Sequence, residues 1–339
     1  MIAATELLLL AITNTISVNI VAQMQGLFTF LKVAALFVIS IGGVVYLFQG
    51  KTENFADSFN GTTNDVTSIA LAIYSCMWAY SGYNNLNEIA EEIVNPKKNI
   101  PKAIIASLTL VTIIYISTNV SYFTLLSKEE FLSVNAVAFT WSERVLGAAA
   151  IFIPLSVMCS VHGASNGGFF TAVRLRFAAA RAGHLPEMLS FLHYKTRIPL
   201  VSLIFNTFVA IVMLIPVDIA ELINIVSFIG FISQGLTVVA FLKMRYDIRN
   251  KPVNPDHFRI PIVVAVVALM VCIFMTVSPF ISNPKIEFLY GVGFVLSGLL
   301  LYLPFVYLGW KLPGWDAFTT ISQLSMELCP TVLDDDLDL

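Results

Sequence analysis

Charged residues are scarce in this chain, and their scarcity indicates its class. Only 12% of the 339 residues are Asp, Glu, Lys or Arg, which is about half the share found in soluble domains. Hydrophobic residues reach 57%, and the mean hydropathy is +0.82. This composition excludes an ordinary soluble protein and predicts an integral membrane protein.

Cysteine and histidine are also few and scattered. The four cysteines form no CxxC pair and no zinc-type spacing, and the four histidines form no metal motif. We therefore expect neither a metal site nor a cofactor.

Long apolar segments are what the chain has instead. A helix that spans a bilayer needs about 20 apolar residues. Nine segments approach this length: 1–18, 27–48, 66–88, 103–126, 149–173, 199–216, 219–242, 260–282 and 287–309. We predict an all-α polytopic membrane protein with a transmembrane domain over 1–309 and a solvated, cytosolic C-terminal tail over 310–339.

Basic residues are distributed unequally between the two sides of these spans. Fourteen lie in the loops of one side, and the other side has Lys51, Lys128, Arg144 and Lys285. The positive-inside rule places the richer side, and with it the C-terminus, in the cytosol. The sequon that begins at Asn60 then faces outward as a candidate glycosylation site. Nine spans also place Met1 outside, so we interpret the chain as an N-terminally truncated form of a longer transporter.

The segment 66–88 changes character along its length. Its first half is apolar, whereas its second half contains Gly82 and the asparagines Asn84, Asn85 and Asn87. Lipid offers no water to an opened backbone, so such a helix is tolerated only where it lines a cavity or packs on protein. Transporters bind substrate on interrupted helices of this kind. A helix–helix contact between small residues is the alternative interpretation.

Two further ionisable residues lie inside predicted spans. Lys32 is a functional candidate because an unpaired charge in lipid is costly, although snorkelling to the nearby interface would also explain it. Glu6 is interpreted as a feature of a cavity or of the truncation. The segment CSVHGASNGGFFT at 159–171 is rich in small residues, which favours close helix packing. Within it, His162 is expected to be a hydrogen-bonded interior residue rather than a proton relay.

Three motifs carry a family resemblance. They are EEIVNPKKNIPK at 91–102, Arg174-Leu175 with RAGHLP at 181–186, and LSGL at 296–299. Together they resemble the light-chain subunits of heteromeric amino acid transporters, in the amino acid–polyamine–organocation superfamily. The resemblance covers almost the whole chain. It implies two inverted five-helix repeats plus two helices, with the nine predicted spans resembling family helices four to twelve.

The resemblance also implies roles for individual residues. The positions that resemble substrate contacts of the family are Trp78, Ala79, Tyr80, Ser81, Gly82 and Asn84. By this resemblance, the tryptophan stands at the position of an aromatic gate. The next four residues stand in an unwound stretch that faces the substrate, and the asparagine stands at a position that helps to set selectivity. Lys32 resembles a lysine whose ammonium takes the place of a sodium ion, which implies sodium-independent transport.

Subfamily features favour a neutral substrate. The runs at 215–219 (IPVDI) and 279–290 (PFISNPKIEFLY) are most similar to the cystine/dibasic (b-zero-plus) light chain. Branches that carry cationic substrates have an acid at the position of Ser81 or Asn84, and desolvating an unpaired ammonium is costly. The run 226–233 lacks the arginine of the cystine/glutamate branch. We expect neutral amino acids, with cystine and dibasic amino acids as further candidates.

The implied function is amino acid exchange by alternating access around a broken helix at 77–84, in the plasma membrane and without an enzymatic step. The expected partners are amino acids, the lipid bilayer and a single-span heavy-chain glycoprotein whose linking cysteine is not in this chain; no nucleic acid is expected. The family's first helix, whose glycine-rich break binds the substrate carboxylate, is also missing here. The alternative is a transport-inactive truncated isoform or fragment that at most binds other subunits. A channel is disfavoured because no filter sequence or charged pore lining is visible.

Overall fold

The computed structural model describes residues 2–16, 18–56, 58–214, 219–249, 260–282, 286–310 and 313–331, with backbone alone at 2, 18–20, 67, 219–221, 282 and 286–287. Some features named above fall partly or wholly outside these residues: Met1, the runs at 215–219 and 279–290, Lys285, and the last residues of the tail at 332–339.

Each of the nine predicted spans contains an apolar helix in the described part of the chain. In order they are α1 (Ile2–Ile16), α2 (Val18–Phe48), α3 (Val66–Ala79), α5 (Pro96–Phe123), α8 (Phe152–Arg181), α9 (Leu200–Met213), α10 (Ile219–Asp247), α11 (Ile262–Ser282) and α12 (Ile286–Tyr302). Six of them are long and apolar enough to cross a membrane. The predicted all-α polytopic fold is therefore confirmed.

Three of the apolar helices are shorter than a span. Helices α1, α3 and α9 have 15, 14 and 14 residues, which corresponds to roughly 21–23 Å at 1.5 Å per residue. The hydrocarbon core of a bilayer is about 30 Å thick. In α3 the reason is local, because the chain leaves helical geometry shortly before Gly82, whose φ is 101°.

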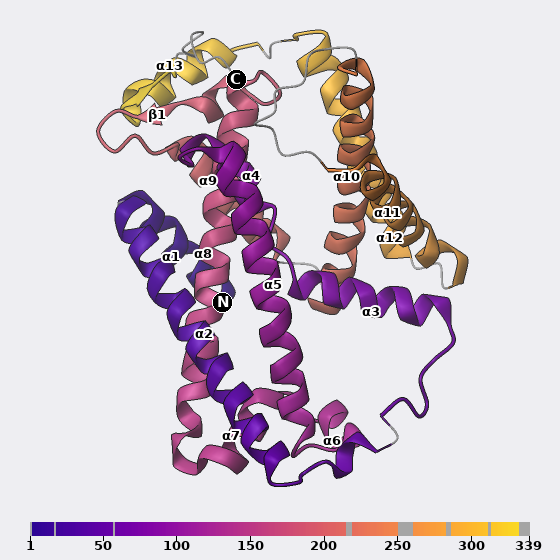
Figure 1. Cartoon of the computed structure of the whole chain (residues 1–339). Coiled ribbons are helices and arrows are strands. Elements are labelled where there is room, and N and C mark those ends of the chain that lie inside the picture. The colour runs from indigo at the N-terminus through magenta and orange to yellow at the C-terminus, as the bar shows by residue number, and fades with distance from the viewer. Residues whose placement is uncertain are drawn as a thin grey trace.

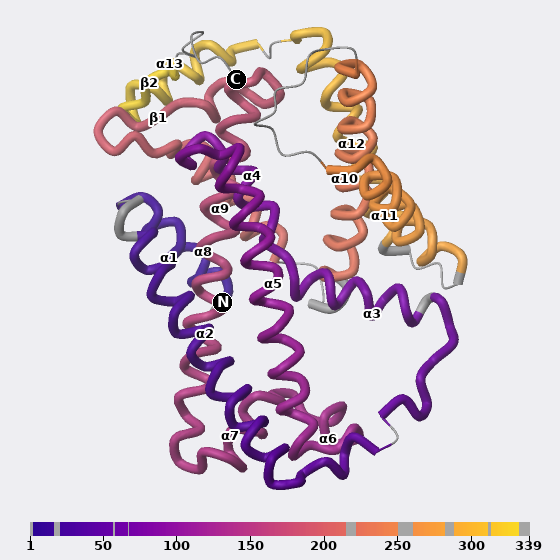
Figure 2. Tube along the Cα trace, in the orientation of Figure 1, coloured from indigo at the N-terminus to yellow at the C-terminus, as the bar shows by residue number. Residues whose placement is uncertain are grey.

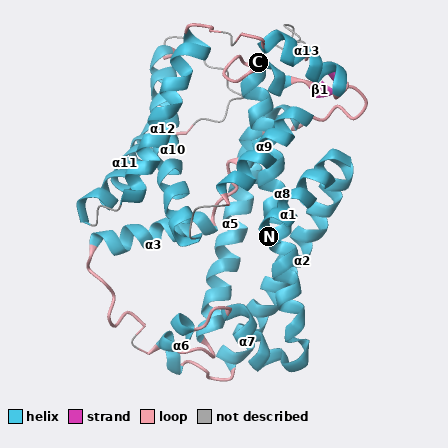
Figure 3. Cartoon of the chain, turned by 180° about the vertical axis from the view of Figure 1, so that it is seen from behind, coloured by secondary structure: helices cyan, strands magenta, loops and turns pink. Residues whose placement is uncertain are grey.

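The helices form two groups that α3 bridges (Figure 1). In one group α2 packs against α5 and α8, and α9 packs against α1 and α8. In the other, α10 packs against α11 and α12, and α3 lies against α10 and α11 (Figures 1 and 3). The core is correspondingly divided. Tyr74, Phe228 and Met275 centre one buried cluster, while Leu10 and Phe169 belong to another.

Glycines bring α2 close to its neighbours. A Cβ added to Gly42 would lie 2.5 Å from the ring of Trp141, which is fully buried on α7 (Val137–Leu146). A Cβ on Gly43 would collide with Ser121 of α5. Small residues of this kind let membrane helices approach closely, and packing then replaces the hydrophobic driving force that lipid does not supply.

Helix α8 continues eight residues beyond its predicted end at 173. It ends at Arg181, where Gly183 adopts a left-handed φ of 79° and the His184 N–H donates to the Ala179 carbonyl at 2.9 Å. A glycine in this conformation is a common way to end a helix. The extra turns carry basic residues, which the negative end of the helix dipole stabilises.

The described part of the C-terminal tail reaches back to the loop between α8 and α9. It forms α13 (Trp315–Ser325) and the short strand β2 (Leu328–Cys329), which pairs antiparallel with β1 (Leu192–His193). Leu328 is only 6% exposed and lies in a buried cluster with Leu189 and Phe191. The expectation of a solvated tail is therefore wrong for Leu328, which packs on the loop between α8 and α9, whereas Phe318, Ile321 and Leu324 of α13 are exposed.

Several of the described loops that are predicted to be cytosolic or outer lie at opposite ends of the molecule (Figure 2). Strands β1 and β2, helix α13 and the short helix α4 (Asn85–Glu88) lie at one end. Helix α6 (Lys128–Ser133), α7 and the connection between α2 and α3 reach the other. This arrangement agrees with the segregation of basic residues in the sequence.

Candidate functional site

The interrupted segment is a true break in the helix. Helix α3 ends at Ala79, and α4 begins at Asn85. Between them the Ser81 N–H donates to the Trp78 carbonyl at 3.1 Å, and the Asn85 N–H donates to the Gly82 carbonyl at 3.2 Å. These are turn bonds rather than helical bonds. Gly82 permits the turn, since positive φ is strained for residues with a Cβ.

A tyrosine from α5 covers one of the carbonyls that the break releases. The Tyr115 hydroxyl donates to the Ala79 carbonyl at 3.0 Å, and its ring meets the edge of Tyr80 with centroids 5.3 Å apart. An uncovered carbonyl at membrane depth would be costly. Tyr115 thus stabilises the break from outside the segment, and the sequence offered no signal for this contact.

The six predicted substrate contacts lie on this one short stretch, and most of them are exposed. The Trp78 side chain is 47% exposed, while Tyr80 is partly buried. Ser81, Gly82 and Asn84 are all exposed. The exposed indole and the turn residues are available to a ligand, but their role as a binding site remains a prediction.

Lys32 lies on α2, which is not one of the two helices that the break separates. It is partly buried and takes part in no ion pair or hydrogen bond within the described residues. Helix α2 packs on α5 and α8, whereas α3 packs on α10 and α11. The predicted role of Lys32 as a substitute for sodium therefore stays untested by these contacts.

Two of the motifs quoted above meet at one end of the molecule. Arg174 Nε lies 2.9 Å from Glu92 Oε1, and Arg181 pairs with Glu91. These ion pairs hold the segment after α4 against the last turns of α8. A cavity of about 630 Å³ lies between α4 and α8, with Glu88 and Arg176 in its wall.

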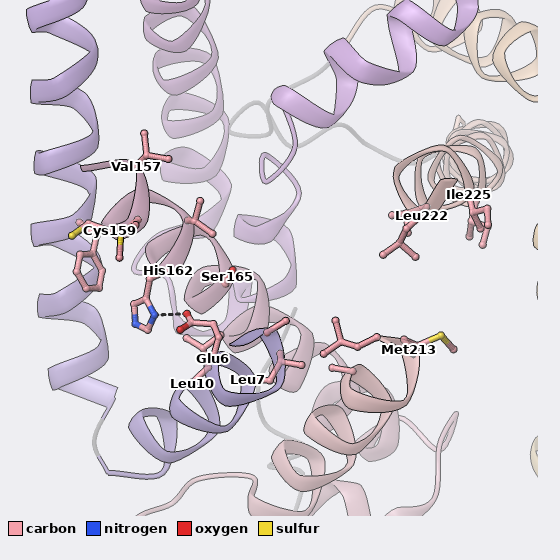
Figure 4. Close-up of a pocket in the computed structure, with 18 of the residues that line it drawn as sticks. Glu6, Leu7, Leu10, Val157, Cys159, His162, Ser165, Met213, Leu222 and Ile225 are labelled. Atoms are coloured by element: carbon pink, nitrogen blue, oxygen red, sulfur yellow. Dashed lines mark hydrogen bonds and ion pairs between the residues drawn. The ribbon is translucent and has the colours of Figure 1, made fainter. Parts of the chain in front are cut away.

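A larger cavity lies elsewhere and contains none of the predicted site residues. It measures about 1360 Å³ and is lined mainly by apolar side chains of α1, α8, α9, α10 and α12. Figure 4 shows Glu6 of α1 and His162 of α8 pointing toward one another at its wall, with Met213 and Leu222 on the opposite side. The two side chains form an ion pair when the imidazole is protonated.

A chain of amides continues from this pair between the same helices. Asn14 Nδ2 donates to Asn166 Oδ1 at 2.9 Å, and Asn166 Nδ2 donates to Gln25 Oε1 of α2 at 3.4 Å. We call Glu6, His162, Asn14, Asn166 and Gln25 the polar seam. The sequence identified Glu6 and His162 as separate polar residues in two spans. It did not indicate their pairing, although an acid and a histidine inside apolar spans are a usable signal.

The candidate glycosylation site is accessible at the end of the molecule opposite α13. Asn60 is exposed in the connection between α2 and α3, and its carbonyl accepts a hydrogen bond from Lys128 Nζ at 2.8 Å. The side-chain amide takes no part in that bond, so it is available to a modifying enzyme. Glycosylation itself remains a prediction.

Comparison with known proteins identifies the family. Residues 1–309 match the family described as Amino acid permease. The chain belongs to the amino acid permease family. It is 40% identical to the human b(0,+)-type amino acid transporter 1 over 331 residues, which cover 97% of this chain and 67% of the relative. The predicted family resemblance is thereby confirmed.

Other relatives of this permease carry different transport names. The human Cystine/glutamate transporter is 37% identical over 338 residues, covering 97% of this chain and 66% of the relative. The Large neutral amino acids transporter small subunit 2 of Oryctolagus cuniculus is 36% identical over 338 residues, covering 98% and 62% respectively. The permease chain thus spans about two-thirds of the length of these relatives. Its helices and relatives together make it an integral membrane protein.

Proposed function

We propose that this permease carries amino acids across a membrane by sodium-independent exchange. The observation that carries the proposal is the break between α3 and α4, which leaves non-helical backbone inside an apolar segment. In transporters such backbone binds substrate, and a helix group rocks around it to alternate access. The matched family and the names of the relatives support the same function.

The substrates that fit this break best are neutral amino acids. Ser81 and Asn84 are uncharged and exposed beside the exposed ring of Trp78. A cationic side chain placed there would lose water without gaining a carboxylate partner, which is unfavourable. Cystine and dibasic amino acids are the weaker candidates, and they provide the comparison in the assay.

Sodium independence is proposed from Lys32. When protonated, its ammonium is a cation fixed at a partly buried helix position, and none of the described carboxylates pairs with it. A fixed positive charge removes the need for a bound sodium ion at the same place. Replacing Lys32 with an uncharged residue should then either abolish exchange or make the exchange rate depend on sodium.

The proposed setting is the plasma membrane, with a single-span heavy-chain glycoprotein as partner. One relative is named a small subunit, which supports a partner for this chain as well. The pairing of β1 with β2 puts the described tail beside the loop that carries Lys195 and Arg197. Because basic loops favour the cytosol, we place the C-terminus there too.

The proposal is tested by uptake into proteoliposomes that contain the 339-residue chain and no sodium. Vesicles are loaded with unlabelled leucine, and labelled leucine, cystine and arginine are offered outside. We expect uptake that depends on internal leucine, with leucine ranked above arginine. Replacement of Trp78 with alanine should reduce leucine exchange at least about ten-fold, since an aromatic contact contributes about 1.4 kcal/mol or more when it is lost.

Trp310→Ala is the matched control, because this tryptophan is exposed at 65% beyond the end of α12. Its exchange should equal that of the wild type. Equal rates of leucine exchange in Trp78→Ala and the wild type would reject the assignment of Trp78 as the gate. A folded chain that exchanges nothing, alone or with a heavy chain, would reject transport by this chain and favour the inactive form.

A further inference from the structure

The acid–imidazole pair at the wall of the 1360 Å³ cavity has no role in the function proposed above. Glu6 and His162 come from helices 156 residues apart in sequence, and their side chains are 34% and 22% exposed. They line the wall of a cavity whose other surface is mostly apolar (Figure 4). Water in the cavity can therefore reach both groups, while most of the surrounding wall cannot stabilise a charge.

Among the described side chains that line this cavity, no other carries a charge that could balance the pair. Phe28 of α2 meets the His162 ring edge-on, with centroids 5.2 Å apart. Helix α1 has no ionisable residue besides Glu6, and α9 has none at all. Among the described side chains that line the cavity, the remaining titratable groups are Cys159 and Tyr290. Lys32, one helical turn beyond Phe28 on α2, does not line it.

Proton exchange at this pair changes the net charge of an apolar wall. With His162 protonated and Glu6 ionised, the pair is neutral overall and held together by charge. Loss of one proton leaves a carboxylate beside a neutral ring, so the wall gains a net negative charge. Histidine is the side chain type that ordinarily gains or loses a proton near neutral pH. Charged groups inside membrane proteins are costly, and those that are present commonly have a function.

We propose that Glu6 and His162 form a proton-binding site that holds the cavity end of α1 against α8. Each cycle of the site binds one proton from water and releases it again, with no other co-reactant. The pair is closed at mildly acidic pH, where the ring is protonated and the carboxyl ionised, and it is weakened at alkaline pH. This coupling to protons goes beyond amino acid exchange and gives the permease a dependence on pH.

The rest of the polar seam limits how far α1 can move. The bonds from Asn14 to Asn166 and from Asn166 to Gln25 join amides that do not titrate. They lie one helical turn along α8 from His162. Loss of the proton should therefore loosen the contact between α1 and α8 at the cavity wall. Helix α1 should stay attached to α8 through the hydrogen bond between Asn14 and Asn166.

A double-mutant cycle in lipid nanodiscs measures the pair directly. Thermal unfolding is followed for the wild type, Glu6→Gln, His162→Gln and the double variant, at about pH 6 and about pH 9. At the lower pH we expect a coupling of roughly 2–4 °C in the unfolding temperature, and at the higher pH less than half of it. Coupling that is absent at both pH values, or equal at both, overturns the proposal.

The control cycle uses Lys195 and Glu327, whose Nζ and Oε2 atoms are 3.7 Å apart at an exposed site. This pair contains no histidine, the side chain type that ordinarily titrates between these pH values, so its coupling should stay constant. If a single variant does not fold, the wild type and the other variant still report whether stability depends on pH through this site.

Leucine exchange at the same two pH values tests the consequence for transport, and only this arm rests on the proposed function. We expect the wild-type rate to change about two-fold or more, and Glu6→Gln and His162→Gln to lose that change. Identical pH profiles in all three would overturn the link to transport. Absence of exchange in every variant would reject the proposed function, while the unfolding cycle still decides the proton site.

Discussion

The break between α3 and α4 and the polar seam between α1 and α8 both keep polar groups inside an apolar chain, but their partners come from different places. At the break, turn bonds within 78–85 satisfy much of the backbone, and Tyr115 adds one bond from another helix. In the seam, Asn166 depends on Asn14 and Gln25, which are 152 and 141 residues away. The break is thus a local property of the chain, whereas the seam exists only after three helices have packed.

This difference predicts how each region responds to mutation. A change at the break should alter the local backbone and leave the helix packing intact. A change in the seam should loosen the contact of α1 and α2 with α8, and its cost should depend on helices distant in sequence. Three substitutions test the comparison, and they are ordered by expected effect.

Gly163→Ala should have the largest effect on stability, because it blocks the approach of α2 to α8. A Cβ at this position would lie 2.9 Å from Phe28 Cβ, which is fixed to the backbone of α2 and cannot swing away. Overpacking of this kind costs about 2 kcal/mol. Unfolding temperature in nanodiscs measures it.

The matched control is Gly168→Ala, five residues further along the same helix, where an added Cβ meets nothing within 4 Å. There alanine should be neutral or slightly stabilising, since it favours helix more than glycine does. If both variants lose the same stability, the contact between Phe28 and Gly163 does not hold the seam together.

Asn166→Leu should have the second largest effect. Leucine has a similar size, but it removes both hydrogen bonds of the Asn166 side-chain amide, which is 4% exposed. Interhelical hydrogen bonds in membranes contribute roughly 0.6–2 kcal/mol, so the two bonds together predict a loss of about 1.5 kcal/mol. Thermal unfolding of the full chain provides the measurement.

Asn119→Leu serves as the comparison, because the Asn119 side chain is exposed and, among the described residues, donates to nothing but the Tyr115 carbonyl of its own helix, at 2.8 Å. We expect it to change stability by less than about 0.5 kcal/mol. Equal losses in the two variants would mean that α1, α2 and α8 gain nothing from the buried amides.

The same contrast explains what the sequence could predict. Composition and apolar runs were sufficient for the class of fold and for the positions of the helices, and Gly82 with its neighbouring asparagines was sufficient for the break. These are properties of consecutive residues. Nothing near Glu6 points to His162, and nothing near Ala79 points to Tyr115, because those contacts depend on how the helices are arranged. The packed strand β2 was missed for the same reason: its partner β1 lies in a loop more than 130 residues earlier.

Gly82→Ala should have the smallest effect on stability, and it should be confined to the break. Gly82 has a φ of 101°, and the nearest atom to an added Cβ is the side-chain nitrogen of Asn85 at 4.0 Å. The cost is therefore backbone strain rather than a collision, at about 1 kcal/mol. Ser81→Ala, next to it in sequence, should unfold at the wild-type temperature. Leucine exchange should fall in Gly82→Ala by more than its loss of stability explains, because the turn that carries the proposed contacts is displaced. A loss of stability as large as that of Gly163→Ala, with exchange unaffected, would show instead that the break is a packing element and that substrate binds elsewhere.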